Sequence, residues 1–235
     1  SLAGAGLAKK GGLLWKIGCW VSNITYKYSD KIIVISEDFK QTLMNKGVPE
    51  EKIVVVYNWV NEKLVVAVSK RENPFYSKFN LDRKKFRVVY AGNLGNAQNI
   101  DVIINSAARL KNHEQIEFVL FGSGGLESDI KKRIADEGLA NMKMFPLQPV
   151  HKVSYVYSLG DLCIVSCKAG FGGSAMPSKT WSILSSARPV LANFDDGELK
   201  RTLEENGFGI FTKADDVDAM VAAIVEASKH PERCD

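Results

Sequence analysis

The stretch KAGFGGSAMPSKTWSILSSARPVLAN, from Lys168 to Asn193, sets the pattern for the chain around it. Three glycines lie near its start, and Pro177 then opens a segment whose apolar residues recur at helical spacing. Proline is favoured at the first position of a helix, where its missing N–H group is not needed. The stretch therefore predicts a loop through Met176 and a helix from Pro177 to about Ser186.

The residue types in this stretch favour an anion site. The start of a helix offers unpaired N–H groups and the positive end of the helix dipole. Glycines let a phosphate approach the backbone, and Lys179 adds a positive charge in the first turn. Asp161 is the only acid between Gly138 and Phe194. The residues alone leave two interpretations open: a diphosphate site, or a tight loop before a buried helix with Lys179 in solvent.

On both sides of this stretch, short apolar segments alternate with amphipathic ones. After residue 85, strands are expected at 86–91, 116–121, 142–145, 162–165, 190–192 and 208–211. Helices are expected at 100–110, 126–137, 150–158, 195–205 and 215–228. This alternation predicts an α/β fold, a Rossmann-like parallel sheet with helices on both faces. Ligands bind to such sheets at the carboxyl ends of the strands. The loops expected there are 92–99, 122–125, 147–149 and 168–176.

The chain begins with an amphipathic helix. The apolar residues of Leu13–Tyr28 share one helical face, and lysines surround that face. A helix packed on its own protein is the preferred interpretation. A helix lying on a membrane surface is the alternative, since basic stretches with tryptophans such as Trp15 and Trp20 suit a lipid interface.

Two short α/β pieces follow. Residues 31–36 predict a buried strand, a helix is expected from Ser36 to Gly47, and residues 53–57 predict a second strand. Two strands are too few for an independent sheet. We therefore expect the polypeptide to be a fragment that opens on the end of one α/β domain. A polar linker at 63–85 then leads to the regular domain at 86–235.

The overall composition excludes several classes of protein. A net charge of +4 over 235 residues is too mild for a dedicated nucleic-acid binder. No apolar run approaches the length of a membrane span. The four cysteines show neither C-x-x-C spacing nor a disulfide framework, which predicts reduced thiols in a cytoplasmic protein.

Common nucleotide and metal motifs are missing as well. Neither the dinucleotide fingerprint G-x-G-x-x-G nor the P-loop pattern G-x-x-x-x-G-K-[ST] occurs. No carboxylate cluster and no histidine and cysteine set has metal-ligand spacing, so no metal cofactor is expected.

Six segments carry a resemblance to a known family. They read SDKIIVISEDFKQTLMNKGVPEEKIVVVYNWV, VVYAGNLGNAQNIDVIINSAARL, FVLFGSGG, MKMFPLQP, YSLGDLCIVS and PSKTWSILSSARPVLAN. Through these segments, the chain from about Tyr26 to Ala227 resembles the back part of a family 4 retaining glycosyltransferase of the GT-B type, which has two Rossmann-like domains. The subgroup it resembles assembles capsular, colanic-acid and O-antigen polysaccharides on lipid-linked acceptors.

The resemblance implies a role for each part of the chain. Residues 1–62 would end the acceptor-side domain, and residues 86–235 would bind a nucleoside diphosphate sugar. Gly92, Asn93 and Gln98 would lie near the donor phosphates, and Gly122 and Gly124 would admit the nucleotide. The remaining implied donor-binding residues are Leu147 and Gln148 at the base, and Phe171, Gly172, Gly173, Ser174, Ser178, Lys179 and Ser182 around the diphosphate, sugar and ribose.

The sequence departs from the family pattern at charged positions. Many relatives have an arginine and a lysine in the first glycine loop, where Asn93 and Gln98 stand here. Many also carry two glutamates with seven residues between them, and Ser174 and Ser182 occupy the corresponding positions. We expect Lys179 to supply the phosphate charge that the first loop lacks. The catalytic residues and the donor's identity are left open.

The resulting prediction is a metal-independent retaining glycosyltransferase of surface polysaccharide biosynthesis. Its partners would be a nucleotide-sugar donor and a lipid-linked glycan acceptor, without nucleic acid. It would work in the cytoplasm, with contact to the inner face of the membrane as an open alternative. We expect the 235-residue polypeptide alone not to transfer sugar. Two other functions are weighed against this one: a sugar-nucleotide 2-epimerase of the same fold, and a non-catalytic sugar-nucleotide-binding protein.

Overall fold

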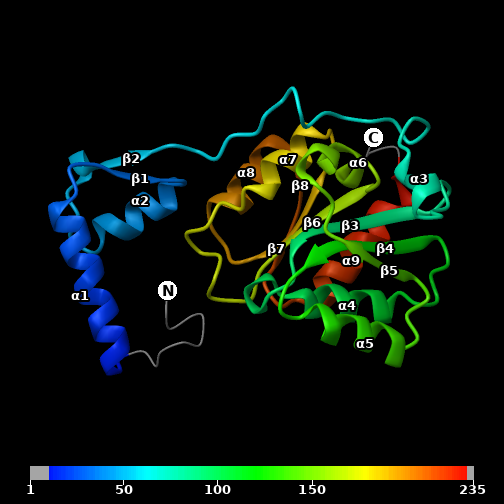
Figure 1. Cartoon of the computed structure of the whole chain (residues 1–235), viewed down its shortest axis with the longest axis horizontal. Coiled ribbons are helices and arrows are strands. Elements are labelled where there is room, and N and C mark those ends of the chain that lie inside the picture. Colours follow the sequence, from blue (N-terminus) through cyan, green and yellow to red (C-terminus); the bar gives the residue numbers. More distant parts are fainter. Residues whose placement is uncertain (1–10, 232–235) are drawn as a thin grey trace.

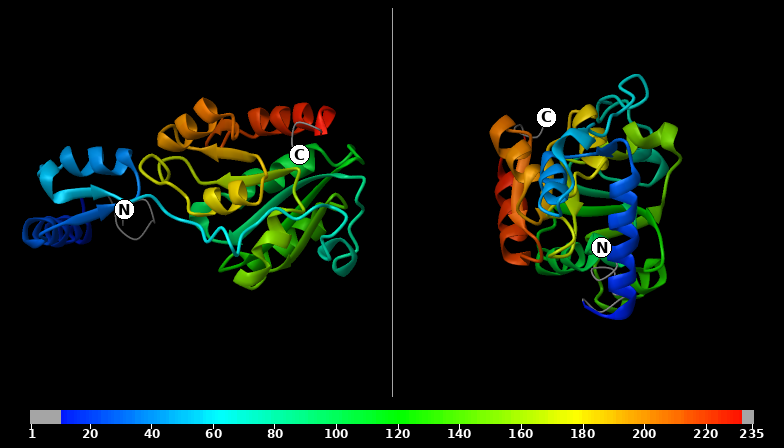
Figure 2. Two further views of the ribbon diagram at one scale, coloured as in Figure 1. Left: turned by 90° about the horizontal axis from the view of Figure 1, so that it is seen from above. Right: turned by 90° about the vertical axis from the view of Figure 1, so that its left-hand side faces the viewer.

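The computed structural model describes residues 11–231. An N-terminal part (residues 11–58) and a larger α/β domain are joined by a long irregular segment that runs along one side of the domain (Figure 1). Seen from above in Figure 2, the two parts lie beside each other, and the yellow loop of the domain faces the N-terminal part.

A six-stranded parallel sheet forms the centre of the large domain, in the order β5-β4-β3-β6-β7-β8. Its strands are β3 (Phe86–Asn93), β4 (Ile116–Ser123), β5 (Met142–Pro146), β6 (Leu162–Ser166), β7 (Val190–Phe194) and β8 (Gly209–Lys213). The chain builds outward from β3 to one edge and then from β6 to the other. Strands β3 and β6 therefore meet at the point where the direction of winding changes, and ligands bind at such points in open α/β sheets.

Helices cover both faces of the sheet, as the alternating pattern predicted. Along β3, Val88 and Tyr90 join one core and Val89 and Ala91 join the other, because successive strand residues point to opposite faces. The first core is closed by α4 (Ile100–Arg109), α5 (Glu127–Asp136) and α9 (Val217–Lys229). The second is closed by α3 (Phe75–Lys78), α6 (Val153–Tyr157), α7 (Lys179–Ser185) and α8 (Glu198–Asn206). The predicted fold class is confirmed.

The N-terminal part is small and open. It consists of α1 (Leu13–Tyr28), β1 (Ile32–Val34), α2 (Glu37–Met44) and β2 (Ile53–Val55), with the two strands paired in parallel. Its core is limited to Val34, Leu43, Val48 and Ile53 with a few half-buried neighbours. The expected strand at 31–36 is shorter than predicted and is not fully buried, since Ile33 is 69% exposed.

The predicted helix over Leu13–Tyr28 is confirmed, but its environment differs from the preferred interpretation. No residue of α1 is buried, and Leu13 and Tyr28 are about three-quarters exposed, at 75% and 74%. In the described part of the chain, the apolar face of α1 is therefore exposed and not packed on the protein. Among residues 11–231, the helices are all too short or too polar for a membrane span.

The joining segment rests on the second face of the domain. The hydroxyl of Ser154 accepts a hydrogen bond from the N–H of Val66, and the hydroxyl of Ser185 donates to the carbonyl of Val65. Within the predicted linker, the side chains of Phe75 and Tyr76 are buried in the second core.

Several predicted element boundaries are off by a few residues. Helix α7 begins at Lys179, because Pro177 instead heads a turn in which its carbonyl accepts from the N–H of Thr180. Strand β3 continues two residues beyond the expected end at Ala91, to Asn93. Helix α8 begins at Glu198, three residues later than expected.

Candidate functional site

The candidate site lies where the carboxyl ends of β3 and β6 meet. Strand β3 ends in the loop 94–99, and β6 ends in the loop 167–178. The two loops are tied together, because the N–H of Lys168 donates to the carbonyl of Ala97 (3.0 Å) and the Ser166 hydroxyl donates to the carbonyl of Gln98 (2.7 Å). The crossover of the sheet thus brings together two segments that are about seventy residues apart in the sequence.

A cavity of about 300 Å³ opens between these loops. It is lined by Asn93, Ala97, Gln98, Val165, Ser166, Cys167, Phe171, Ala175, Pro177, Lys179 and Phe194. Four of the predicted donor-binding residues, Asn93, Gln98, Phe171 and Lys179, therefore face one space. The amide groups of Asn93 and Gln98 hydrogen-bond to each other at 3.3 Å.

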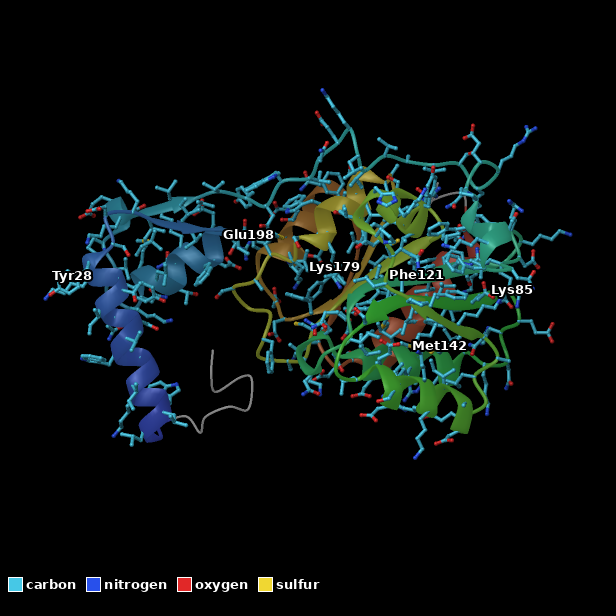
Figure 3. All side chains as sticks on the ribbon, viewed as in Figure 1. Tyr28, Lys85, Phe121, Met142, Lys179 and Glu198 are labelled. Carbon is cyan, nitrogen blue, oxygen red and sulfur yellow. The ribbon has the colours of Figure 1, made fainter. Side chains whose placement is uncertain are left out.

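Lys179 brings a charge to this cavity without a counter-charge. The residue as a whole is half-buried, and its ammonium group lies 4.1 Å from the centre of the fully buried Tyr90 ring. Figure 3 labels Lys179 within the large domain. Burial lowers the pKa of Lys179 to about 8, and no carboxylate of the described residues pairs with it. A cation–π contact offsets part of the desolvation cost. An anion in the cavity would offset more of it, and the interpretation of Lys179 as a merely solvated lysine does not fit this position.

Gly92 lies beside that ammonium group. Its φ is +149°, and a Cβ atom built on it would come within 2.9 Å of the Lys179 Nζ. The hydroxyl of Tyr90 donates to the carbonyl of Asn93 (2.7 Å), which fixes the end of β3 around the lysine. A side chain at position 92 would therefore require the lysine ammonium group to shift.

Two further predicted glycines, Gly122 and Gly124, are explained by packing between loops. A Cβ on Gly122 would lie 2.7 Å from the Leu94 side chain, and one on Gly124 would lie 2.5 Å from the Leu94 carbonyl oxygen. The φ of Gly124 is also +155°. These glycines let the end of β4 close against the loop after β3, and neither lines the cavity that holds Lys179.

A second, smaller cavity has a volume of about 110 Å³ and is lined in part by Gly92, the neighbour of the Lys179 ammonium group. Its lining is mostly apolar and consists of Ala91, Gly92, Phe121, Leu147, Gln148, Val150, Val153, Val156 and Tyr157. Leu147 and Gln148, predicted to meet the base, are therefore placed together here. The side chain of Gln148 donates to the carbonyl of Pro146 (2.8 Å) and accepts from Lys78 (3.2 Å).

The glycine-rich loop holds a carboxylate that sequence reasoning missed. The N–H groups of Gly170 and Gly172 donate to Asp195 Oδ1 (3.0 Å) and Oδ2 (2.7 Å). The N–H of Gly172, one of the residues predicted to lie around the diphosphate and sugar, is therefore directed to Asp195 in this structure. Asp195 directly follows β7 and lies one residue beyond the range 138–194, in which Asp161 is the only acid. The acids within that range therefore gave no sign of a carboxylate at the glycine-rich loop.

The remaining predicted residues lie outside both cavities. Ser178 is exposed at the start of α7, and Ser182 is half-buried within α7, with its carbonyl accepting from the N–H and the hydroxyl of Ser186. Gly173 is exposed, and the Ser174 hydroxyl is 2.8 Å from that of Thr42 in the N-terminal part. The two serines at the positions of the family glutamates thus do not line the cavities seen here.

The described residues contain no metal-binding cluster: no group of three or more histidine, cysteine, aspartate and glutamate side chains within residues 11–231 is arranged to hold an ion. Two thiols are buried in the domain: Cys167, which lines the larger cavity, and Cys163, near the start of β6. Burial raises the pKa of Cys167 to about 12 and raises the pKa of Cys163 further, so both stay protonated at neutral pH.

Comparison with known families identifies this architecture. Residues 72–235 match the family described as Glycosyl transferases group 1, which covers the sheet and both cavities. The chain belongs to the group 1 glycosyl transferases. Residues 4–64 of this group 1 transferase match a second family, described as Glycosyltransferase Family 4.

Two relatives and one solved structure extend the comparison. The group 1 chain is 27% identical over 229 residues to the glycosyltransferase WbjE of Pseudomonas aeruginosa. It is 27% identical over 234 residues to the colanic acid biosynthesis glycosyl transferase WcaI of Escherichia coli (strain K12). The alignments cover 96% and 97% of this chain but only 56% and 57% of the relatives, so the chain spans just over half of their length.

Among solved structures, Anabaena HepE in complex with UDP and glucose superposes on the chain with a TM-score of 0.77. The match covers 90% of this chain and 57% of HepE at 15% sequence identity. At that identity the match confirms the GT-B fold alone.

Proposed function

We propose that this chain carries the nucleotide-sugar donor site of a retaining glycosyltransferase. The enzyme would transfer a sugar from a nucleoside diphosphate sugar to a lipid-linked glycan during surface polysaccharide biosynthesis. Family membership and the similarity to WbjE and WcaI support this class of reaction. The observation that carries the proposal is the inward ammonium group of Lys179, which has no carboxylate partner among the described residues. It lines the larger cavity at the crossover of the sheet and lies beside Gly92, which lines the smaller one.

The two cavities suit the two ends of a nucleotide. The larger one, with Lys179 and the amides of Asn93 and Gln98, fits a diphosphate and the sugar attached to it. The smaller one, with Leu147 and Val150, fits a base held by apolar contact. As the bond to the sugar breaks, negative charge grows on the leaving diphosphate, and a fixed cation in a site of low polarity stabilises that charge.

Retention of configuration and the donor's identity belong to the same proposal. The structure of HepE was solved with UDP and glucose, which makes UDP the first nucleotide to test here. The family glutamates are replaced by Ser174 and Ser182. This replacement keeps a non-catalytic sugar-nucleotide-binding protein as the second candidate.

The proposal places the reaction at the cytoplasmic face of the membrane. A lipid-linked acceptor is anchored in a bilayer, and α1 presents exposed apolar side chains, including Trp20 at 64% exposure, beside Lys16 and Lys27. Such a helix suits an interface with anionic lipid. Co-sedimentation with vesicles of anionic lipid tests this part, and a chain that stays in the supernatant would argue against it.

Thermal stabilisation by nucleotides tests the donor site. UDP, GDP and ADP are each added to the chain, with the matching nucleosides as controls. A nucleotide at 100 times its Kd should raise the free energy of unfolding by roughly 2.7 kcal/mol. If no nucleoside diphosphate stabilises the chain more than its nucleoside does, the proposed donor site is absent. An assay of the complete protein with nucleotide sugar then separates the candidate functions. Sugar transfer, epimerisation, or binding without turnover would each identify one of them.

A further inference from the structure

The loop that walls the larger cavity is hydrogen-bonded to the N-terminal part of the chain. The Ser36 hydroxyl donates to the carbonyl of Ser174 (3.1 Å), and the hydroxyls of Thr42 and Ser174 lie 2.8 Å apart. The side-chain amide of Asn58 donates to the carbonyl of Met176 (3.0 Å). Three side chains from residues 36–58 therefore hold two residues of the loop.

Two helices, α2 and α8, cap each other across the same contact. The N–H of Glu198, at the start of α8, donates to Asp38 Oδ2 (2.6 Å), and the N–H of Asp38, at the start of α2, donates to Glu198 Oε2 (3.2 Å). The first N–H groups of a helix have no partner within the helix. Each part therefore supplies a cap for a helix of the other, and Arg201 adds an ion pair to Asp38 (2.5 Å).

The contact converges on one point of the backbone. A Cβ on Gly197 would lie 2.9 Å from Asp38 Oδ2 and 3.2 Å from the carbonyl oxygen of Gly173, so α8, α2 and the loop meet there. Figure 3 shows Glu198 at the junction of the two parts. The Tyr57 hydroxyl also hydrogen-bonds to Glu198, and this bond is the main reason that the pKa of Tyr57 is raised to about 12.

The position of this loop determines the shape of the cavity. Phe171, Ala175 and Pro177 line the cavity together with Lys179. On the far side of the loop, Asp195 holds Gly170 and Gly172. Ser174 and Met176 are hydrogen-bonded to the N-terminal part, whereas the N–H of Ala175 donates to the carbonyl of Gly172 (2.8 Å) and the Met176 side chain is buried in the second core. A shift of the N-terminal part therefore acts on the residues on either side of Ala175.

We propose that Ser36, Asp38, Thr42 and Asn58 are positioning residues for the donor site. They hold the loop 173–176 against the cavity, and they couple the placement of the N-terminal part to occupancy of the cavity. Because coupling between two sites is reciprocal, a ligand in the cavity also tightens the contact between the parts. The coupling to ligand rests on the proposed donor site, whereas the anchoring of the loop does not.

Hydrogen exchange of the loop amides tests the anchoring in the absence of ligand. The double variant Asp38→Ala with Asn58→Ala removes one cap and one loop anchor, and Gln41→Ala on the exposed side of α2 is the matched control. Loss of these bonds should speed exchange at residues 173–176 by about tenfold. Exchange in Gln41→Ala should stay as in the parent. An unchanged rate in the double variant would overturn the proposal.

A second variant tests whether faster exchange in the loop is only a result of unfolding of α2. Thr42→Val keeps the shape of the side chain and both helix caps but loses the hydroxyl contact with Ser174. Exchange at the buried Leu43 reports whether α2 is intact. If Thr42→Val leaves α2 protected and speeds exchange in the loop, the anchoring is supported. If exchange speeds only together with that of Leu43, the loop effect is secondary to unfolding and the proposal fails.

Binding measurements then test the coupling. UDP, GDP and ADP are each titrated into the parent, the double variant and Gln41→Ala. For a nucleotide that binds the parent, the double variant should bind about tenfold more weakly, since opening of the loop competes with binding. Equal affinity despite faster loop exchange would reject the coupling. Failure of the parent to bind any of the three would reject the donor site, while the exchange result would still decide the anchoring.

Discussion

Lys179 shows how burial of one charge can prepare a residue for a ligand. Desolvation lowers its pKa to about 8, so near neutral pH the ammonium group is charged but poorly solvated. A phosphate beside it would favour the charged form and raise the pKa again. The neutral neighbours Asn93 and Gln98 contribute hydrogen bonds and no competing charge.

This pKa predicts that nucleotide affinity depends on pH in a defined direction. Below about pH 7 Lys179 is protonated with and without ligand, so it contributes no dependence. Above pH 8 the free protein loses the proton first, and binding must take it up again. Affinity should therefore fall by up to roughly tenfold per pH unit above 8 until the lysine of the complex also titrates. Calorimetry from pH 7 to 9.5, in buffers of different ionisation enthalpy, checks the proton uptake; a flat profile would contradict it.

Asp195 is the second residue whose role depends on its surroundings. Its carboxylate accepts two backbone N–H bonds from the glycine loop and is half-buried. Asp195→Ala should lower the free energy of unfolding by roughly 1.5–3 kcal/mol, because hydrogen bonds to a charged group are the stronger kind. Asp196→Ala is the matched control. Its carboxylate is exposed and forms a surface ion pair with Lys200, and such exposed pairs contribute little to stability. If urea denaturation shows the same loss of unfolding free energy in Asp195→Ala and Asp196→Ala, the bonds to Gly170 and Gly172 contribute little to stability.

At the scale of elements, much of the large domain could be predicted from the sequence. Strand and helix periods are local, so β3, α4 and their successors follow from apolar spacing. The glycine loops were also predicted to lie at the carboxyl ends of the strands. The reason for Gly122 and Gly124 could not be predicted, because it depends on the approach of Leu94 from another loop. The same holds for Asp195, whose partners are more than twenty residues away.

The packing of β4 against the first loop predicts a difference between two adjacent glycines. Gly124→Ala would force a Cβ against the Leu94 carbonyl oxygen at a positive φ, whereas a Cβ on Gly125 meets nothing within 4 Å. Gly124→Ala should therefore cost about 1–3 kcal/mol of stability and Gly125→Ala far less. Chemical denaturation of the two variants gives the comparison. Similar stability of both would mean that the loop after β3 can move aside at little cost.

At the scale of the whole molecule, two parts with different cores meet at the loop 173–176. The large domain has two extensive cores, whereas the N-terminal part has a small one and exposes α1. The chain spans just over half of the length of WbjE and WcaI. Periodicity predicted the elements of the N-terminal part but not the exposure of α1, since an amphipathic pattern does not specify what covers its apolar face.

The charge arrangement of the molecule predicts that nucleotide binding does not need a divalent metal. Within residues 11–231 no cluster of acidic or histidine side chains can hold an ion, and Lys179 supplies the positive charge at the cavity. Affinity for a nucleoside diphosphate should therefore be the same with magnesium and after treatment with EDTA. Calorimetry under both conditions checks this, and affinity that vanishes with EDTA would show that a metal bridges the phosphates.

The most direct test of the donor site is the affinity of Lys179→Ala for nucleoside diphosphates, measured by calorimetry at low salt beside Lys132→Ala, which removes an exposed lysine of α5. Loss of a charge-assisted bond to phosphate is worth roughly 1.5–3 kcal/mol, or about ten- to hundredfold in Kd. For Lys179→Ala we predict a weakening of about ten- to hundredfold for the nucleoside diphosphate and a much smaller change for the nucleoside. For Lys132→Ala we predict no change in affinity. Parent-like affinity of Lys179→Ala would contradict the placement of the diphosphate beside this lysine.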